Sequence, residues 1–472
     1  MKQKIIAFLI GAMAWTTAAA GGYVPTKENA EARAAFEEMR FGVFIHWGIY
    51  SMFAQGEWYL NSGLSDAEYQ KAASGFYPAR FDADAWVKAI KASGAKYITF
   101  TSRHHDGFSM YGTRTGDYDI VDATPFKRDV LKELSLACRE QDVRLHLYYS
   151  ILDWHRTDYP VGRTGLKTGR ALRPDYDSYF AFMKTQVKEL LTGYAPIGGL
   201  WFDGYWDHDA DSIPFDWRMP EFYRYIHELQ PACLIGNNHH ITPIEGEDFQ
   251  MFERDLPGEN TAGLSGQEVS QLPLEMCQTM NGMWGYKVAD QNYKSTETLI
   301  QLIARAAAKS SNLLLNIGPQ PNGELPAAAL DRLRGIGAWM DVNGESIYGT
   351  KGAGEYAWGV ATKREGCVYA HVFNNETTEI ELPWTGKKPK AVMALDNGAK
   401  LQARFDKKTQ RLIILLPEGR KSADCSSFPS KERSDSSRWN RRARCKHNAY
   451  LQTQLHRQRH DRWPGRSPAS DQ

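Results

Sequence analysis

The stretch 198–209, GGLWFDGYWDHD, places a carboxylate at the end of a short apolar run. A run of this length and content predicts a buried strand rather than a helix. Side chains alternate along a strand, so Trp201 and Asp203 should point to the same face. An aspartate at the carboxyl end of a buried strand is typical of the place where a parallel barrel carries its chemistry. The alternative is an aspartate that only caps the following turn.

The same arrangement of an apolar run followed by functional side chains recurs along the chain. The expected strands are 41–45, 95–100, 143–150, 198–203, 233–235 and 313–317. Helical periodicity of apolar residues occurs over 28–40, 129–139 and 296–307. Strands that alternate with helices predict an α/β fold, and polar strand ends favour a (β/α)8 barrel of the TIM type. Only five or six strands are convincing, so closure of the barrel is an inference.

Beyond about residue 348 the pattern changes to short alternating runs separated by turn residues. The expected strands are 367–373, 378–382, 391–395 and 412–416. Such a pattern predicts an antiparallel β-sandwich over 349–420, following a catalytic domain over 21–348.

The two ends of the chain differ from the rest. Residues 1–20 have a basic start, an apolar core and an Ala-rich end, which predicts a signal peptide and a periplasmic or extracellular protein. The apolar core is too short for a membrane span.

Residues 421–472 contain 12 Lys and Arg against 5 Asp and Glu and no apolar periodicity. We expect a basic tail that is disordered or non-native, for example a frameshifted end, and that offers the sandwich no partner strand.

Composition narrows the class of function. The 472 residues include 14 Trp, and 42% are hydrophobic, which suits an enzyme with a large core and an aromatic cleft. A net charge of +1 argues against a general nucleic-acid binder. The six cysteines are scattered, which predicts free or buried thiols.

Several motifs occur in a fixed order between about residues 40 and 348. They are FGVFIHWGIYS (41–51), GEWY (56–59), TSRHHDGF (101–108), KRD (127–129), LYYS (147–150), LDW (152–154), WFDG (201–204) and LLLNIGPQPNG (313–323). Together they resemble glycoside hydrolase family 29, the retaining α-L-fucosidases. The resemblance implies a (β/α)8-like barrel followed by a β-sandwich, and an exo-acting enzyme that hydrolyses terminal α-L-fucosides of glycans by double displacement.

In that family two carboxyl groups do the chemistry, and roughly 5–5.5 Å separates such a pair in retaining enzymes. Asp203 falls on the position of the nucleophile. Glu253 lies in the segment that carries the acid/base, and its neighbours Met251 and Phe252 should desolvate it and raise its pKa. Glu275, in LPLEMC, is the alternative acid/base, although a structural role is favoured for it.

The resemblance also implies a fucose pocket. Its expected residues are His46, Glu57, Trp58, His104, His105, Tyr148, Trp201, His239 and Trp284. His46 could instead be a buried strand-end histidine, and Glu57 a helix cap. Adjacent histidines on a regular strand face opposite ways, so His104 or His105 could only support the other. His239 stands nearest to a position where many members have Arg, which would make the local charge depend on pH.

No cofactor and no metal are expected, since adjacent histidines share no face. The expected partner is a fucosylated oligosaccharide or glycoconjugate, with no nucleic acid. Linkage preference and oligomeric state are left open. Two other functions compete: a retaining glycosidase acting on a fucose-like β-D-galactoside, and a sugar-binding barrel without catalysis.

Overall fold

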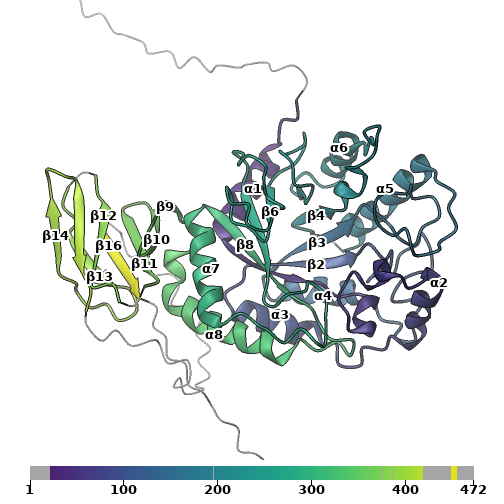
Figure 1. The fold of residues 1–472 in the computed structure, drawn as a ribbon, viewed down its shortest axis with the longest axis horizontal. Coiled ribbons are helices and arrows are strands. Elements are labelled where there is room, and N and C mark those ends of the chain that lie inside the picture. The colour runs from purple at the N-terminus through teal and green to yellow at the C-terminus, as the bar shows by residue number, and fades with distance from the viewer. Residues whose placement is uncertain (1–21, 195, 375, 386, 418–447, 454–472) are drawn as a thin grey trace, which may run out of the picture.

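The computed structural model describes residues 22–194, 196–374, 376–385, 387–417 and 448–453, the last segment by its backbone. A parallel barrel with its helices forms one part, and two β-sheets form the other (Figure 1). The helices α7 (Thr296–Ala308) and α8 (Ala327–Asn343) lie between the barrel and the sheets. The leader predicted over residues 1–20 lies outside the described residues.

The barrel sheet has eight parallel strands, which confirms the predicted fold class. They are β1 (Phe41–Ile45), β2 (Tyr97–Arg103), β3 (Arg144–Ser150), β4 (Gly199–Asp203), β5 (Leu234–Asn237), β6 (Gln250–Glu253), β7 (Leu274–Thr279) and β8 (Ser311–Ile317). Sequence periodicity had indicated six of them. It missed β6 and β7, because each carries polar residues among its apolar ones.

Helices surround this sheet, and several begin at a side chain that caps the first turn. The remaining helices are α1 (Lys27–Met39), α2 (Asp66–Tyr69), α3 (Ala83–Ala92), α4 (Val130–Glu140), α5 (Tyr176–Gly193) and α6 (Met219–Leu229), with 3-10 turns at Ile49–Phe53, Tyr59–Ser62, Gln70–Gly75, Tyr205–His208 and Gly344–Ser346. Asp129 caps α4 and Ser295 caps α7, each accepting a hydrogen bond from a backbone N–H three residues later. These caps fix where the strand-to-helix loops end.

The barrel interior is an apolar core of its own, separate from the layer between sheet and helices. Tyr148, Trp201 and Met251 are buried there, and Phe36 of α1 belongs to the same cluster. Phe202 instead belongs to the core between the sheet and the helices. The alternation predicted for β4 is therefore confirmed: Trp201 faces inward, Phe202 outward, and Asp203 follows on the inner side at the strand end.

The barrel wall has one seam, between β5 and β6. Within the described residues these two strands form no ladder, although every other neighbouring pair does. Asp248 replaces the ladder there: its backbone N–H donates to the Ile235 carbonyl, and its Oδ2 accepts from the Ile235 N–H, both at 2.7 Å. Arg33 of α1 donates to the other Asp248 oxygen at 2.6 Å. One carboxylate thus connects both strands and a helix.

The second part is a β-sandwich. One sheet contains β9 (Lys351–Tyr356), β10 (Gly359–Arg364), β11 (Cys367–Val372), β13 (Ala391–Ala394) and β16 (Asn448–Thr453), and the other β12 (Glu379–Pro383), β14 (Ala403–Asp406) and β15 (Arg411–Leu415). Val372 of one sheet and Leu412 of the other share one buried cluster. The sandwich is predominantly antiparallel, as expected.

The expectation that the basic tail offers the sandwich no strand is wrong. β16 comes from that tail and pairs in parallel with both β11 and β13. Backbone hydrogen bonding to two neighbours does not require a periodic side-chain pattern, so composition alone could not reveal it. The rest of the tail, 421–447 and 454–472, lies outside the described residues.

The four cysteines among the described residues, Cys138, Cys233, Cys277 and Cys367, are buried free thiols, as predicted for them. Across the same residues, no helix combines the length and the apolar character that a bilayer crossing requires.

Candidate active site

A pocket of about 230 Å³ opens at the carboxyl ends of the barrel strands. Its lining includes ten residues that sequence reasoning had selected: His46, Glu57, Trp58, His104, His105, Tyr148, Trp201, Asp203, Glu253 and Trp284. It also includes Phe44, Arg163, Trp206, Asn238, His240 and Leu264. The predicted residues therefore meet in one cavity, with the single exception of His239.

Asp203 ends β4 and is held by four donors. Its Oδ2 accepts from the Tyr148 hydroxyl at 3.0 Å, and its Oδ1 accepts from the Gly204 N–H at 2.8 Å and from Trp206 Nε1 at 3.0 Å. Asn238 Nδ2 lies 3.4 Å from the same Oδ1. Gly204 has φ +102°, a left-handed conformation that favours glycine and turns the chain so that Trp206 returns to the carboxylate.

Burial raises the pKa of Asp203 to about 6, and the nearby charge of Glu253 adds to the rise. Hydrogen bonds from Trp206 and Tyr148 act in the opposite direction, because they stabilise the ionised form. Asp203 is therefore an ionised, rigidly held carboxylate near neutral pH.

Glu253 ends β6 and faces Asp203 across the seam. Asn238 Nδ2 donates to Glu253 Oε2 at 2.8 Å, and His240 Nε2 lies 3.3 Å from the same oxygen. The Asn238 amide thus connects the two carboxyl groups. Asn238 Nδ2 also lies 3.4 Å from Asp203 Oδ1. The distance between Asp203 Oδ1 and Glu253 Oε2 therefore cannot exceed the sum of their two distances to this nitrogen.

The expectation that its neighbours raise the pKa of Glu253 is wrong. Burial does raise it, but hydrogen bonds from His240 and Asn238 and the charges of His240 and Arg254 outweigh burial, so the pKa lies below its ordinary value. Met251 faces the barrel interior and Phe252 the outer core. The polar groups at the strand end, rather than these apolar neighbours, dominate the carboxyl group's environment.

Glu275 lies outside the pocket lining, in the barrel interior. Tyr97 donates to its Oε2 at 2.6 Å, and Trp201 Nε1 donates to its Oε1 at 2.8 Å. Burial raises its pKa to about 7. Glu275 therefore supports Trp201 from beneath the pocket and has no contact with Asp203 or Glu253 among the described interactions.

His46 presents a defined hydrogen-bond acceptor to the pocket. Burial lowers its pKa to about 3, so the ring is neutral. Its Nδ1 lies 2.7 Å from Asn316 Oδ1, and Asn316 Nδ2 donates to the Trp284 carbonyl, which fixes the amide orientation. Nδ1 must therefore carry the proton, and Nε2 is left as an acceptor for a hydroxyl.

Both adjacent histidines line the pocket, although a regular strand would have turned them to opposite faces. β2 ends at Arg103, and strand alternation does not apply to the residues that follow. His104 stacks on Tyr148 at 5.3 Å, and its Nδ1 has no partner among the described residues. His105 Nδ1 lies 2.7 Å from Ser150 Oγ, and its Nε2 lies 3.5 Å from Asp203 Oδ2.

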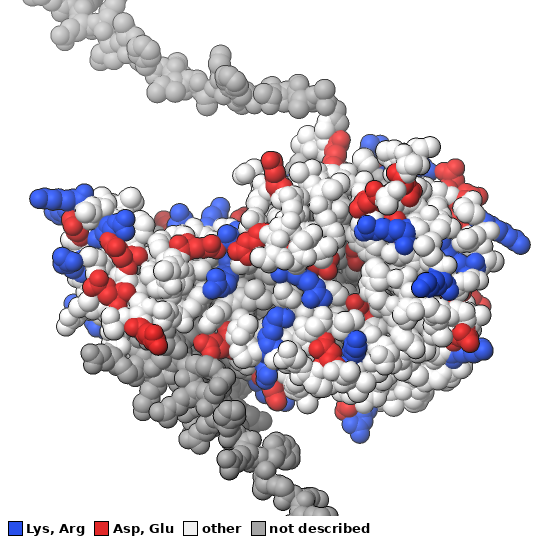
Figure 2. All heavy atoms as spheres, in the orientation of Figure 1, with Lys and Arg blue, Asp and Glu red and all other residues white. Residues whose placement is uncertain are grey.

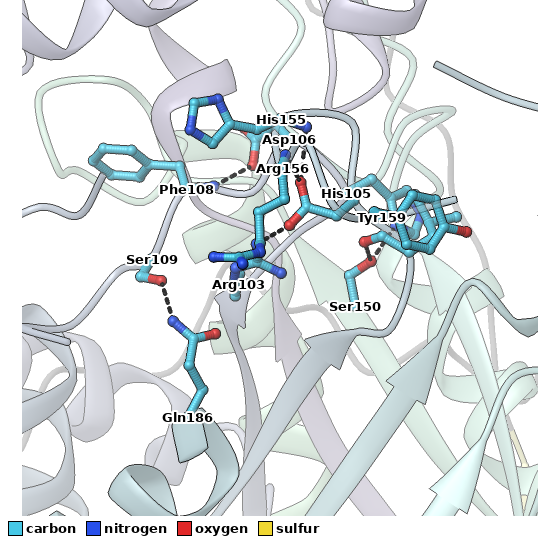
Figure 3. A network of polar contacts seen from close by, with 12 residues as sticks. Arg103, His105, Asp106, Phe108, Ser109, Ser150, His155, Arg156, Tyr159 and Gln186 are labelled. Atoms are coloured by element: carbon cyan, nitrogen blue, oxygen red, sulfur yellow. Dashed lines mark hydrogen bonds and ion pairs between the residues drawn. The ribbon is translucent and has the colours of Figure 1, made fainter. Parts of the chain in front are cut away.

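A polar network behind the histidines holds their segment in place (Figure 3). Figure 3 shows His105 beside Ser150 and the dashed contacts of Arg103, Phe108 and Ser109. The buried Arg103 forms an ion pair with Asp153, whose Oδ1 in turn accepts from the backbone N–H of His155 and Arg156. The histidine segment is thus tied to the loop that follows β3.

Glu57 is part of the pocket wall rather than a helix cap. Its Oε2 accepts from the Gly285 N–H at 2.7 Å, which fixes the segment that carries Trp284. Burial raises the pKa of Glu57. Trp58 stacks on Trp206 with ring centroids 5.7 Å apart, so the two indoles form one aromatic wall. A wall of this kind suits the apolar face of a deoxysugar.

His239 does not belong to the pocket, which corrects the prediction. Its Nε2 lies 2.9 Å from Glu247 Oε1, and both side chains are buried away from the cavity. The next residue, His240, has φ +63°, and this left-handed backbone brings its ring to Glu253. A shift by one position was sufficient to select the wrong histidine.

Sequence reasoning missed Asn238, His240 and Trp206, although each stood in a stretch that it had singled out. GNNHH (236–240) contains the last two residues of β5 and the three that follow, and GYWDHD (204–209) directly follows Asp203. The available signal for these pocket residues was therefore their position just after the end of a strand. It could not tell which residue of each stretch turns inward, because backbone dihedrals after a strand are not periodic.

A family model described as Alpha-L-fucosidase matches residues 12–345 of this chain. The chain is similar to alpha-L-fucosidase isoenzyme 1 from Paenibacillus thiaminolyticus: 34% identity, TM-score 0.75, covering 84% of this chain and 97% of that one. It is similar to a mutant GH29 alpha-L-fucosidase from Bacteroides thetaiotaomicron, trapped as a covalent intermediate with 2-fluoro-fucosyl fluoride (25%, TM-score 0.71, 84% and 97% covered). It is also 29% identical to the plasma alpha-L-fucosidase of Rattus norvegicus, over 70% of this chain and 73% of the relative.

Proposed function

Because the chain belongs to the alpha-L-fucosidase family, glycoside hydrolase family 29, we propose that Asp203 and Glu253 are the two carboxyl groups of its retaining hydrolysis of α-L-fucosides. The chain is an alpha-L-fucosidase of the retaining type. The observation that carries the residue assignment is the Asn238 amide, which joins the two carboxyl groups across the pocket floor.

In the first step a carboxylate oxygen of Asp203 attacks the anomeric carbon of the fucosyl residue. The bond from that carbon to the glycosidic oxygen breaks, and Glu253 gives its proton to this oxygen, so a fucosyl ester on Asp203 and a free alcohol result. In the second step Glu253 accepts a proton from water, the water oxygen attacks the anomeric carbon, and Asp203 leaves as carboxylate.

The separation of the carboxyl groups supports retention of configuration. Inverting enzymes need room for a water between the two groups, and their carboxyl groups are roughly 6.5–9.5 Å apart. Contacts of 3.4 Å and 2.8 Å to one nitrogen hold this pair closer than that. The arrangement therefore favours direct attack by Asp203.

The proton must reside on Glu253 when the substrate binds, whereas the unliganded site favours an ionised Glu253. The glycosidic oxygen of a bound fucoside is a hydrogen-bond acceptor, to which protonated Glu253 can donate and ionised Glu253 cannot. Binding therefore favours the acid form of Glu253 and leaves Asp203, with its own donors, as the ionised partner.

The test is labelling with 2-fluoro-fucosyl fluoride followed by peptide mapping, together with NMR of the first product anomer. We expect the label on Asp203 and α-L-fucose as the first product, and a label on another residue or an inverted product contradicts the assignment. Turnover of 4-nitrophenyl β-D-galactoside, measured beside the α-L-fucoside, tests the alternative sugar.

The substrate class is a fucosylated glycan. His46 Nε2, His104 Nδ1 and Asn238 Oδ1 are polar atoms without a protein partner among the described residues, and all three residues line the pocket. Figure 2 shows Lys and Arg intermixed with Asp and Glu on the viewed face, without a large area of one sign. This distribution supports a neutral sugar in the pocket rather than nucleic acid as the partner.

We also propose that the protein is exported after cleavage near Ala20. The basic start and short apolar core of residues 1–20 support this proposal. N-terminal sequencing of the protein recovered from cell fractions is the test. We expect the mature chain to begin near Gly21 in the periplasm or the medium, and an intact Met1 terminus in the cytoplasm contradicts it.

A further inference from the structure

The mouth of the pocket differs from its floor because it carries a free cation. On the floor, His46, Tyr148 and Trp201 are buried. At the mouth, Arg163 is exposed and Leu264 is half-buried. In an exo-acting fucosidase the terminal fucose occupies the floor, and the remainder of the glycan extends through the mouth. Residues at the mouth therefore meet the sugar to which fucose is attached.

The guanidinium of Arg163 lies over the ring of Trp206, 5.2 Å from its centroid. Within the described part of the chain it has no carboxylate and no hydrogen-bond partner. Two other arginines of the same loop are used internally: Arg156 forms an ion pair with Asp158, and Arg170 donates to the carbonyls of Arg156 and Tyr159. Arg163 is thus left with its N–H groups available.

The backbone beneath Arg163 is fixed. Its N–H donates to the Asp207 carbonyl at 2.8 Å, and the N–H and hydroxyl of Thr164 donate to Asp207 Oδ1 at 2.9 and 2.6 Å. Asp207 is fully buried and also accepts from the Tyr159 hydroxyl. A Cβ at Gly162 would collide with Asp207 Oδ2, so this close approach requires glycine. The segment therefore presents Arg163 from a rigid base, which lowers the entropy cost of binding.

No spare carboxylate of the pocket lining neutralises this cation. The acidic residues of the lining are Asp203, Glu253 and Glu57. The first two form the catalytic pair, and Glu57 is buried and bonded to the Gly285 N–H. The guanidinium carbon of Arg163 lies over the indole of Trp206, and the guanidinium N–H groups can form paired hydrogen bonds to an oxyanion.

Resting on the proposed fucosidase function, we propose that Arg163 forms a subsite for an anionic group, a sulfate or a carboxylate, on the sugar to which fucose is attached. Trp206 connects this subsite to the reaction, since its Nε1 donates to Asp203 while its ring supports Arg163. An anionic leaving group therefore gains a contact that a neutral one lacks, and the gain is expressed in kcat/KM of the first step.

The test compares 4-nitrophenyl α-L-fucoside with its 3-carboxy-4-nitrophenyl counterpart, which places a carboxylate on the leaving group without depending on linkage preference. The measured quantity is the ratio of kcat/KM for the carboxylated to the neutral substrate. We expect Arg163→Gln to lower this ratio about tenfold, and Arg163→Lys to lower it less, because charge remains while the paired N–H edge is lost. A 3-sulfo-4-nitrophenyl fucoside separates sulfate from carboxylate.

Lys167→Gln is the matched control, since it removes one positive charge from the same loop outside the pocket lining. We expect its ratio to equal that of the unsubstituted enzyme. An unchanged ratio in Arg163→Gln, or an equal fall in Lys167→Gln, overturns the subsite. If the unsubstituted enzyme hydrolyses neither fucoside, the proposed function fails instead.

Discussion

The two sides of the pocket are built differently. On the fucose side, His46, Tyr148 and Trp201 lie on or directly after strands that are fully paired in the barrel wall, and a hydrogen bond to a side chain of the barrel holds each of them. On the leaving-group side, Asn238 and Glu253 flank the seam, and their side chains contact one another, with His240 beside Glu253 and Asp203 beside Asn238. Recognition of the terminal sugar therefore rests on the fold, whereas proton transfer rests on a few hydrogen bonds between neighbouring side chains.

The largest expected effect separates the two glutamates. Glu253→Ala should lower kcat/KM by about 10²- to 10⁴-fold on substrates with poor leaving groups, because the leaving oxygen loses its proton donor. Azide should restore turnover of an activated aryl fucoside, with a fucosyl azide as product. Glu275→Ala should show no azide rescue, since Glu275 lies outside the pocket lining. Rescue of Glu275→Ala alone would exchange their roles.

The Asn238 bridge should have the next largest effect. Asn238→Ala removes a donor shared by both carboxyl groups, and a hydrogen bond to a charged group is worth roughly 1.5–3 kcal/mol. We therefore expect kcat to fall about 10- to 100-fold while the thermal unfolding midpoint changes little. Steady-state kinetics and calorimetry of the variant measure both quantities. A loss confined to KM would place Asn238 in sugar binding only.

Two substitutions should move opposite limbs of the pH profile of kcat/KM. In the unliganded enzyme the pKa of Asp203 is about 6, whereas the pKa of Glu253 lies below its ordinary value, so the Glu253 pKa sets the acidic limb and the Asp203 pKa sets the basic limb. Trp206→Phe removes a hydrogen bond that lowers the pKa of Asp203, so the basic limb should move to higher pH. His240→Gly, which suits the left-handed backbone, removes a contact that lowers the pKa of Glu253, so the acidic limb should move to higher pH. If either variant moves both limbs equally, the two sides are not separable.

The smallest expected effect on turnover belongs to Glu275. Its pKa is raised from 4.5 to about 7, so the folded protein binds more protons than the unfolded chain between these values, and stability falls as pH rises through this window. The loss amounts to roughly 3 kcal/mol for a shift of this size. Glu275→Gln keeps the shape of the side chain and should flatten the pH dependence. Urea unfolding at pH 5 and pH 7.5, compared with the unsubstituted protein, measures the difference. An unchanged slope would show that Glu275 has the same pKa in the folded and the unfolded protein.

The fucose side could be predicted from the sequence because regular strands dictate it. Asp203 and Trp201 share a face by alternation, and His46 follows a strand of five buried residues. The leaving-group side could be predicted only in part. Glu253 was predicted from a family resemblance. His239 was predicted in place of His240, because the left-handed backbone that turns His240 toward the pocket leaves no periodic signal in the sequence.

The same limit applies to the rest of the fold. β6 and β7 escaped detection because their inward positions carry Glu253 and Glu275, whose polarity interrupts the apolar pattern. β16 escaped because its pairing is made by the backbone. Strands that carry functional side chains, and a strand contributed by a polar tail, are thus the elements that composition describes least well.

The missing ladder between β5 and β6 has a consequence for how this enzyme can evolve. The loop between Asn238 and Asp248 lies on the leaving-group side of the pocket. Insertions or deletions in this loop leave the pairing register of the barrel strands unchanged, because β5 and β6 form no ladder. New substrate ranges can therefore arise by altering loop length at this one point, while the cradle for fucose is inherited unchanged.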